Sequence, residues 1–447
     1  MNRNVPFAEA LRVWTRVALL SFGGPAGQIA VMHRIVVEEK KWVDEARFLH
    51  ALNYCMLLPG PEAQQLATYL GWLLHGTRGG LVAGTLFVLP GFVSILALSV
   101  LYVSAGESPL VAALFAGLAP AVVAIVVAAV VRIGKRALKS ALQVAVAVAA
   151  FTSIFFFDVP YPWVVVGAAL TGFVGVRFAP NSFTAARHAA SNAVPIAPLA
   201  IELPPSPPPT RNRSLRVLAI GLTLWFVPIA ALAWTFGREH ALFEQSVFFS
   251  KAAVVTFGGA YSVLAYVAQQ AVDVYGWLAP GEMLDGLAMA ETTPGPLIQV
   301  VQFVGFMGAY RQPGDLEPMT AALLGSVVTT WVTFVPCFIW ILLGAPYVER
   351  LRGRPRLDAA LSAITAAVVG VVLNLSLWFA LHSFFTIVAV ERVGPLRLLV
   401  PDFATVQFVP LLVAIVATLA LVRLRVGLVK TLVACVVVGG AHHSIVS

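Results

Sequence analysis

Two short segments that disturb a helix occur twice in this chain. Ser21-Phe22-Gly23-Gly24 is matched by Thr256-Phe257-Gly258-Gly259, and Pro59-Gly60-Pro61 is matched by Pro294-Gly295-Pro296. Adjacent glycines weaken a helix, and Pro-Gly-Pro cannot continue one. A helix that starts at Pro61 or Pro296 directs its free N–H groups and the positive end of its dipole at whatever lies before it. This arrangement suits an anion, so we expect these segments to line an anion-binding site.

Basic residues occupy equivalent places before the two glycine segments. Arg16 and Lys251 each lie five residues before the Ser or Thr that opens the segment. An intramembrane charge costs at least ~2.5 kcal/mol, so a retained one normally faces the bundle interior or a cavity. We therefore predict that both residues bind the anion; the alternative is that both side chains extend to an interface. Glu9 is expected to pair with Arg12 or Arg16 on one helical face.

Carboxylates and amides accompany the Pro-Gly-Pro segments. Glu62 follows the first segment and Glu291 precedes the second, and neither has an acidic equivalent in the other half. Because burial raises the pKa of a carboxyl group, both are candidates for proton coupling, and a structural hydrogen bond at a helix end is the alternative. Gln64 and Gln299 lie in the first turn after each break. We expect them to donate to substrate oxygens or to form interhelical hydrogen bonds.

The paired segments belong to one repeat. When the chain is shifted by 235 residues, Trp42 aligns with Trp277, and residues 16–64 show 13 identities in 49 positions without a gap. Chance would give roughly 5 to 10% identity at average residue usage. The repeat therefore predicts two homologous halves that place the same breaks around one site.

Composition identifies the elements that must position these residues. Of 447 residues 59% are apolar and only 11% are charged, and the mean hydropathy is +0.88. Soluble domains carry about 25% charged residues, so this is an integral membrane protein. Nine apolar stretches are long enough for transmembrane helices, which excludes a strand-built pore. They are 80–103, 110–131, 140–157, 159–176, 217–236, 318–345, 359–381, 403–422 and 426–441.

Basic loops predict the orientation of these helices. Arginine and lysine cluster in four connections, at 132–139, 177–216, 350–356 and 423–430. Such clusters favour the cytoplasmic side. Counting crossings outward places Arg78 and the N-terminus inside, and the loop at 311–317 and the C-terminus outside. Because the loops at 78 and at 311–317 are repeat equivalents, the two halves are predicted to be inverted, as in many secondary transporters.

The resulting expectation is an all-α polytopic membrane bundle with interrupted helices near the midplane. It has thirteen crossings if the interrupted segments of both halves span the membrane. We expect an N-terminal repeat at 1–179 and a Pro-rich cytoplasmic linker at 180–214. A helix at 215–241 adds one membrane crossing, which inverts the orientation of the second half. The inverted C-terminal repeat occupies 242–447.

Other classes of chemistry lack sequence support. Cys55, Cys337 and Cys435 stand far apart in apolar surroundings, which argues against a disulfide framework or a metal site. The net charge of +8 comes from the loops and reports topology, so no nucleic-acid partner is expected. No phosphate-binding loop of the Gly-rich, Lys-Ser/Thr type occurs, and no cofactor is expected. Energy must then come from a gradient or from another chain.

These motifs resemble the chromate ion transporter family in its long form. The resemblance covers nearly the whole chain. In the first half it rests on Ser21-Phe22-Gly23-Gly24-Pro25-Ala26-Gly27-Gln28, on Trp42 and the helix after it, and on Leu58-Pro59-Gly60-Pro61-Glu62-Ala63-Gln64-Gln65; in the second half it rests on Thr256 to Gly259 and Thr293 to Gln299. The resemblance implies export of chromate across the bacterial inner membrane, linked to the proton motive force, with sulfate as the natural mimic. A transporter of sulfate or another tetrahedral oxyanion is the alternative within the class. A membrane-embedded enzyme or a sensor is the more distant alternative, from another class of protein. The oligomeric state is open, with a homodimer as one arrangement.

Overall fold

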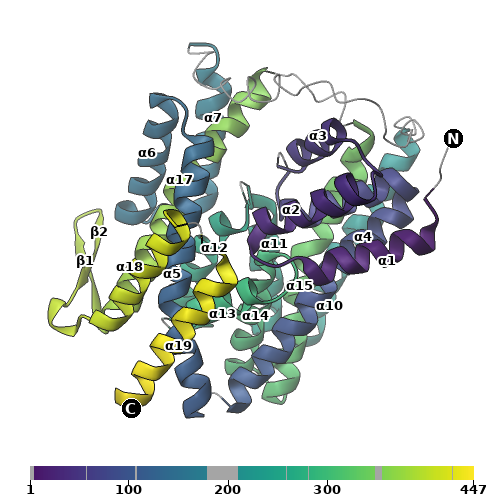
Figure 1. Ribbon diagram of the computed structural model, residues 1–447. Helices are drawn as coiled ribbons and strands as arrows, with labels where there is room; N and C mark the ends of the chain where they lie inside the picture. The colour runs from purple at the N-terminus through teal and green to yellow at the C-terminus, as the bar shows by residue number, and fades with distance from the viewer. Residues whose placement is uncertain are drawn as a thin grey trace. The chain divides into compact units, whose positions relative to one another are not determined.

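The computed structural model describes residues 5–56, 58–105, 108–178, 210–257, 259–279, 281–347, 355–424 and 426–446. These residues are mostly helical (Figure 1). Most of the predicted linker, 180–209, and the predicted site residue Gly258 lie outside the described residues.

All nine apolar stretches predicted from the sequence form helices. Within the described ranges, five helices are long and apolar enough to cross a membrane, and four apolar helices are shorter. The long ones are α4 (Glu62–Ala105), α5 (Pro109–Ala137), α10 (Arg211–Phe236), α15 (Pro318–Gly344) and α17 (Pro355–Phe384). The shorter ones are α6 (Ala141–Phe157), α7 (Tyr161–Gly175), α18 (Phe408–Val422) and α19 (Leu428–Val446).

The 235-residue shift that aligns the sequence halves also aligns their secondary structure. Each half begins with a helix, a break, a second helix that ends in a π-helical turn, and a short third helix. In the first half these are α1 (Phe7–Leu20), α2 (Gly24–His33), η1 (Arg34–Glu39) and α3 (Glu45–Cys55). In the second half they are α11 (Ala241–Val255), α12 (Ala260–Gln269), η2 (Gln270–Val274) and α13 (Glu282–Thr292). The rare π-helical turn at the same place in both halves supports a duplicated ancestor.

The helices pack into two compact units, and each unit draws segments from both halves. Unit 1 comprises 1–99, 191–260 and 290–353, and unit 2 comprises 100–190, 261–289 and 354–447. The boundaries predicted from the sequence mark the two repeats along the chain, whereas the units are defined by packing. The predicted boundaries therefore stay a prediction.

Two helical hairpins are central to unit 1. The α4 helix bends back at His75 and Gly76, where Gly76 has φ +60°. Its two arms are so close that a Cβ on Gly71 would lie 2.4 Å from the Gly79 carbonyl oxygen. The second half builds the same hairpin from α14 (Val300–Arg311) and α15, and a Cβ on Gly325 would lie 2.4 Å from the Gly305 oxygen. Small residues therefore allow the close helix packing that membrane bundles use.

Shorter helices of unit 1 run across its long ones. In Figure 1, α1 and α2 (purple) cross the direction of α10 and α15 instead of running along it. The buried face of α1 presents Val13, Trp14 and Val17 to a core that also holds Trp42 and Phe48. This packing fixes where the chain enters the first break.

Unit 2 packs around α17. Close backbone contacts join it to α6 and α7, since a Cβ on Gly370 would lie 2.1 Å from the Ala147 oxygen, and one on Gly172 would lie 2.2 Å from the Ala359 oxygen. Between α17 and α18 the chain forms an antiparallel hairpin of β1 (Val388–Val393) and β2 (Leu396–Pro401). The all-helical prediction missed this hairpin, which a β-branched run and a turn with Gly394 at φ +61° allow.

Candidate functional site

Both helix interruptions predicted in each half are present. In the first half α1 ends at Leu20, and Gly23 and Gly24 take φ values of +80° and +70° before α2 continues. In the second half α11 ends at Val255, and Gly259 has φ +98°. Positive φ favours glycine, which explains why these positions carry it.

The Pro-Gly-Pro segments use glycine in the same way. Gly60 has φ +124° and Gly295 has φ +110°. Helix α4 begins at Glu62, directly after Pro61, as predicted. After Pro296 the chain first makes a 3₁₀ turn, η3 (Leu297–Gln299), and then enters α14. Each Pro-Gly-Pro therefore precedes a new helix, although the second one starts more tightly wound than the first.

Within unit 1, each half's Pro-Gly-Pro segment binds the other half's glycine segment. The Gly60 N–H donates to the Thr256 carbonyl oxygen at 2.7 Å, and the Gly295 N–H donates to the Ser21 carbonyl oxygen at 3.0 Å. The 235-residue shift converts Gly60 into Gly295 and Ser21 into Thr256. The same hydrogen bond is therefore made twice, once in each direction between the halves.

A second pair of equivalent contacts surrounds these hydrogen bonds. A Cβ on Gly60 would lie 2.8 Å from Cys337 Sγ, and a Cβ on Gly295 would lie 2.9 Å from Gly91 Cα. Gly91 follows Pro90 in α4, and Cys337 follows Pro336 in α15. After an insertion around Pro313 to Pro318 the halves are related by a shift of 246 residues, which matches Pro90 with Pro336 and Gly79 with Gly325. The pseudo-symmetry therefore extends into the long helices behind the breaks.

Buried glutamines surround the breaks. Gln65 Nε2 donates to the Pro59 oxygen at 2.7 Å, Gln28 Nε2 to the Gly295 oxygen at 2.6 Å, and Gln299 Nε2 to Gln302 Oε1 at 2.6 Å. Among the glutamines of the two motifs and of the turns after the breaks, the Oε1 atoms of four are buried without a hydrogen-bond partner: Gln28, Gln64, Gln65 and Gln299. Buried polar atoms normally have partners, so the region around the breaks has unused hydrogen-bond acceptors.

Acidic residues lie at or near the breaks. Glu62 is half-buried, and its Oε1 lies 3.3 Å from the position of a Cβ on Gly259. Glu291 is 2% exposed and, among the described Asp, Glu, Lys and Arg residues, it alone is buried. Of the two proton-coupling candidates, Glu62 therefore lies near the second glycine segment and Glu291 is buried.

The predicted basic residues lie on exposed surface. Arg16 Nη1 pairs with Glu39 Oε2 at 2.6 Å with half of the arginine side chain exposed, and Lys251 is exposed on α11. The expected pairing of Glu9 with Arg12 or Arg16 is wrong, because Glu9 Oε1 binds Lys40 Nζ at 2.8 Å instead. The folding of η1 against α1 brings Lys40 and Glu39 within reach, and helical spacing alone could not predict this.

Of the aromatic residues in the glycine segments, Phe22 is exposed and Phe257 is half-buried. Pro59 and Pro294 are half-buried, while Pro61 and Pro296 are buried with the glycines between them. Sequence reasoning did not single out Gln28, Gln65 or Gln302 as site residues. Gln28 and Gln65 belong to the motifs that begin at Ser21 and Leu58. Their amide side chains, close in sequence to a predicted break, could have identified them as site residues.

Comparison with known proteins identifies the family. A sequence model described as "Chromate transporter" matches residues 8–173 and 243–440, one match in each half. A chromate transport protein of Pseudomonas aeruginosa is 33% identical over 363 residues, covering 80% of this chain and 77% of that protein. A chromate transport protein of Cupriavidus metallidurans is 28% identical over 380 residues, 85% of this chain and 84% of that protein.

More distant relatives extend beyond these bacteria. An uncharacterised transporter of Methanocaldococcus jannaschii is 25% identical over 381 residues, 85% of this chain and 86% of that protein. No solved structure matches the chain. The chain is a multi-pass membrane transporter, not an enzyme, and it belongs to the chromate transporter family in the long form with two homologous domains.

Proposed function

We propose that this protein exports chromate across the bacterial inner membrane and that export is linked to the proton motive force. Two relatives that align over most of the chain are named chromate transport proteins. Sulfate has the same tetrahedral shape and charge as chromate, so transport of sulfate or another oxyanion is the alternative outcome.

The observation that carries this proposal is the hydrogen bond made twice between the halves. Gly60 N–H to Thr256 and Gly295 N–H to Ser21 bring all four breaks of unit 1 into two equivalent contacts. Transporters built from inverted repeats bind substrate where such interrupted helices meet. The inverted orientation of the halves and the midplane depth of the breaks are part of this proposal.

The donors for the anion follow from which amides are already used. The N–H groups of Gly60 and Gly295 are bonded to carbonyl oxygens, so the substrate must use other donors. The first amides of a helix lack intrahelical acceptors, and they carry the positive end of the dipole. We assign anion binding to the first turns after Pro61 and Pro296. Gln64 and Gln299 are side chains of those turns, and to bind the anion their Nε2 groups must exchange the hydrogen bonds to Thr68 and Gln302 for bonds to the substrate.

Charge at the site must be balanced. Arg16 and Lys251 are proposed to supply positive potential to the dianion, which requires Arg16 to leave Glu39. Glu62 and Glu291 are proposed to carry the coupled proton. A carboxylate beside a dianion is destabilised by like charge, so protonation of the acid and occupancy by the anion are coupled.

Everted membrane vesicles test the transported ion. Vesicles containing the protein should accumulate labelled chromate when a proton gradient is imposed, and excess sulfate should compete. Uptake no greater than in vesicles without the protein would refute chromate transport. Faster uptake of labelled sulfate than of chromate would favour the alternative substrate.

Substitution of the acids tests the coupling. Glu62→Gln and Glu291→Gln should reduce the stimulation by the gradient in at least one case while leaving chromate binding in place. Glu239→Gln, in the exposed turn before α11, is the matched control and should behave as wild type. Full stimulation in both variants would show that neither acid carries the proton.

A further inference from the structure

The β-hairpin of unit 2 directs one arginine inward. Arg397 on β2 pairs in register with Arg392 on β1, yet the Arg397 side chain is 13% exposed and that of Arg392 is 73% exposed. Like charges directly opposite each other destabilise a hairpin. The arrangement therefore needs acidic partners, and the structure provides them outside the hairpin.

Two aspartates from separate segments hold the Arg397 guanidinium. Nη1 lies 3.1 Å from Asp158 Oδ1, and Nη2 lies 3.0 Å from Asp273 Oδ2. Asp158 ends α6 with φ +55°, and Asp273 lies on the π-helical turn η2. Gln269, at the end of α12, also donates to Asp158. One side chain thus ties the hairpin to the α6–α7 turn and to η2.

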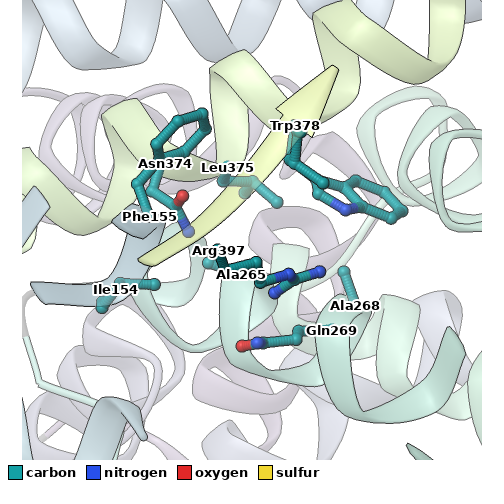
Figure 2. Close-up of a pocket in the computed structure, with 10 residues that line it drawn as sticks. Ile154, Phe155, Ala265, Ala268, Gln269, Asn374, Leu375, Trp378 and Arg397 are labelled. Carbon is teal, nitrogen blue, oxygen red and sulfur yellow. The ribbon is translucent and has the colours of Figure 1, made fainter. Parts of the chain in front are cut away.

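Open space remains behind this clasp. Figure 2 shows Arg397 reaching from β2 into the region between Asn374, Trp378 and Gln269. Together with apolar side chains of α6 and α12 these residues line a cavity of about 20 Å³, enough for one water. At this point the hairpin is therefore held by the charges on Arg397 beside a cavity that is otherwise lined largely by apolar side chains.

The repeat places an acidic clasp on both π-helical turns. Asp273 on η2 is equivalent to Glu38 on η1, and Glu38 Oε1 lies 3.1 Å from His33 Nδ1. In each half the turn follows the helix that leaves the glycine break. Single π-helical turns often mark functional positions, and here an acidic residue of each turn contacts a basic side chain.

We propose that Arg397 is the latch of a gate, in which the β1–β2 hairpin closes over the interior of unit 2 and opens during the transport cycle. The opening step rests on the proposed transport function. The closing contact does not, because it depends only on the guanidinium and the two carboxylates. Opening breaks both ion pairs together, since a single side chain makes them.

Cysteine accessibility tests the closed state without any substrate. Asn374→Cys is introduced after Cys55, Cys337 and Cys435 are replaced by Ala, and its reaction with a bulky hydrophilic maleimide is timed in purified full-length protein. Arg397→Gln should raise the labelling rate by about tenfold, because charge-assisted bonds to two carboxylates are lost. Arg392→Gln is the matched control, since it removes only a 3.8 Å contact with Asp158, and it should change the rate by less than about twofold.

Further variants separate a latch from a folding contact. Asp273→Asn removes one of the two ion pairs and should give an intermediate rate, which also covers the case in which Arg397→Gln does not fold. Exchanging the charges, Arg397→Asp with Asp273→Arg, in a background of Asp158→Asn that removes the like charge, should return the rate toward that of Asp158→Asn alone. Equal labelling in wild type, Arg397→Gln and Asp273→Asn would overturn the latch.

Flux then tests the opening step. Chromate flux per molecule should differ between wild type and Arg397→Gln if the hairpin opens in each cycle. Raised labelling with unchanged flux would overturn the role in transport while leaving the clasp itself in place. Absence of chromate transport in the wild-type protein would instead refute the proposed function, and the labelling result would stand by itself.

Discussion

Replacing Gly295 by alanine is the sharpest perturbation of the double contact between the halves. The φ of Gly295 is +110°, and an added Cβ would lie 2.9 Å from Gly91 Cα and 3.1 Å from Gly91 N. Both neighbours are backbone atoms of α4 and cannot rotate away. The substitution therefore strains the backbone and also pushes α4 away from the break.

The expected cost follows from these two effects. A non-glycine residue in this region of φ costs about 1–3 kcal/mol, and overpacking a tight contact costs about 1–3 kcal/mol more. At Gly60 a new Cβ would meet Cys337 Sγ and Gln65 Nε2, both at 2.8 Å, and side-chain ends can move. We therefore expect about 2–6 kcal/mol for Gly295→Ala and about 1–3 kcal/mol for Gly60→Ala.

Flux and stability are measured on the same samples. We expect at least ~1.4 kcal/mol of this cost to oppose the conformation that binds chromate, so uptake per inserted molecule should fall by about tenfold or more in Gly295→Ala. Adding Cys337→Ala should partly rescue Gly60→Ala, whereas the backbone contact at Gly295 allows no such rescue. Gly76→Ala is the control, since Gly76 also has positive φ but has no atom near the added Cβ.

Two results would refute this reasoning. If Gly295→Ala transports as well as Gly76→Ala, the close contact with Gly91 is not required for function. If Gly295→Ala reduces only the amount of folded protein and leaves the chromate flux per inserted molecule unchanged, the break is a structural turn and the anion site lies elsewhere.

Other predictions concern charge, topology and pH. Arg16→Gln and Lys251→Gln should each weaken chromate transport strongly while insertion is normal, and retained affinity and flux in the double variant would contradict their role in binding. A cysteine at Asp315 should react with an impermeant reagent from outside the cell and one at Arg78 should not; the reverse pattern would contradict the inverted topology. Amide N–H groups at the start of α15 lower the pKa of Glu317, so this cap is formed above the ordinary carboxyl range and lost as pH falls through the lowered pKa. Amide exchange at that helix start should accelerate in acid, and equal acceleration in Glu317→Ala would contradict the assignment.

Local chemistry explains why much of the fold was predictable. Apolar length alone located nine helices, and the conformational limits of glycine and proline located the breaks at residues 23–24, 60, 259 and 295. The repeat and the family followed from short motifs in matching order. These features depend on near neighbours in the chain, so a sequence read in order contains them.

Tertiary structure decided which of these pieces meet. Helical spacing predicted that Glu9 pairs with a neighbour on α1, but the packing of η1 provides Lys40 for it. Likewise, no local pattern indicates that Arg397, from a hairpin absent from the predicted fold, reaches two aspartates more than 120 residues away. The sequence by itself determined where the backbone must break. Only packing between distant segments decided that Gly60 binds Thr256 and Gly295 binds Ser21, because such hydrogen bonds depend on how the halves fold together.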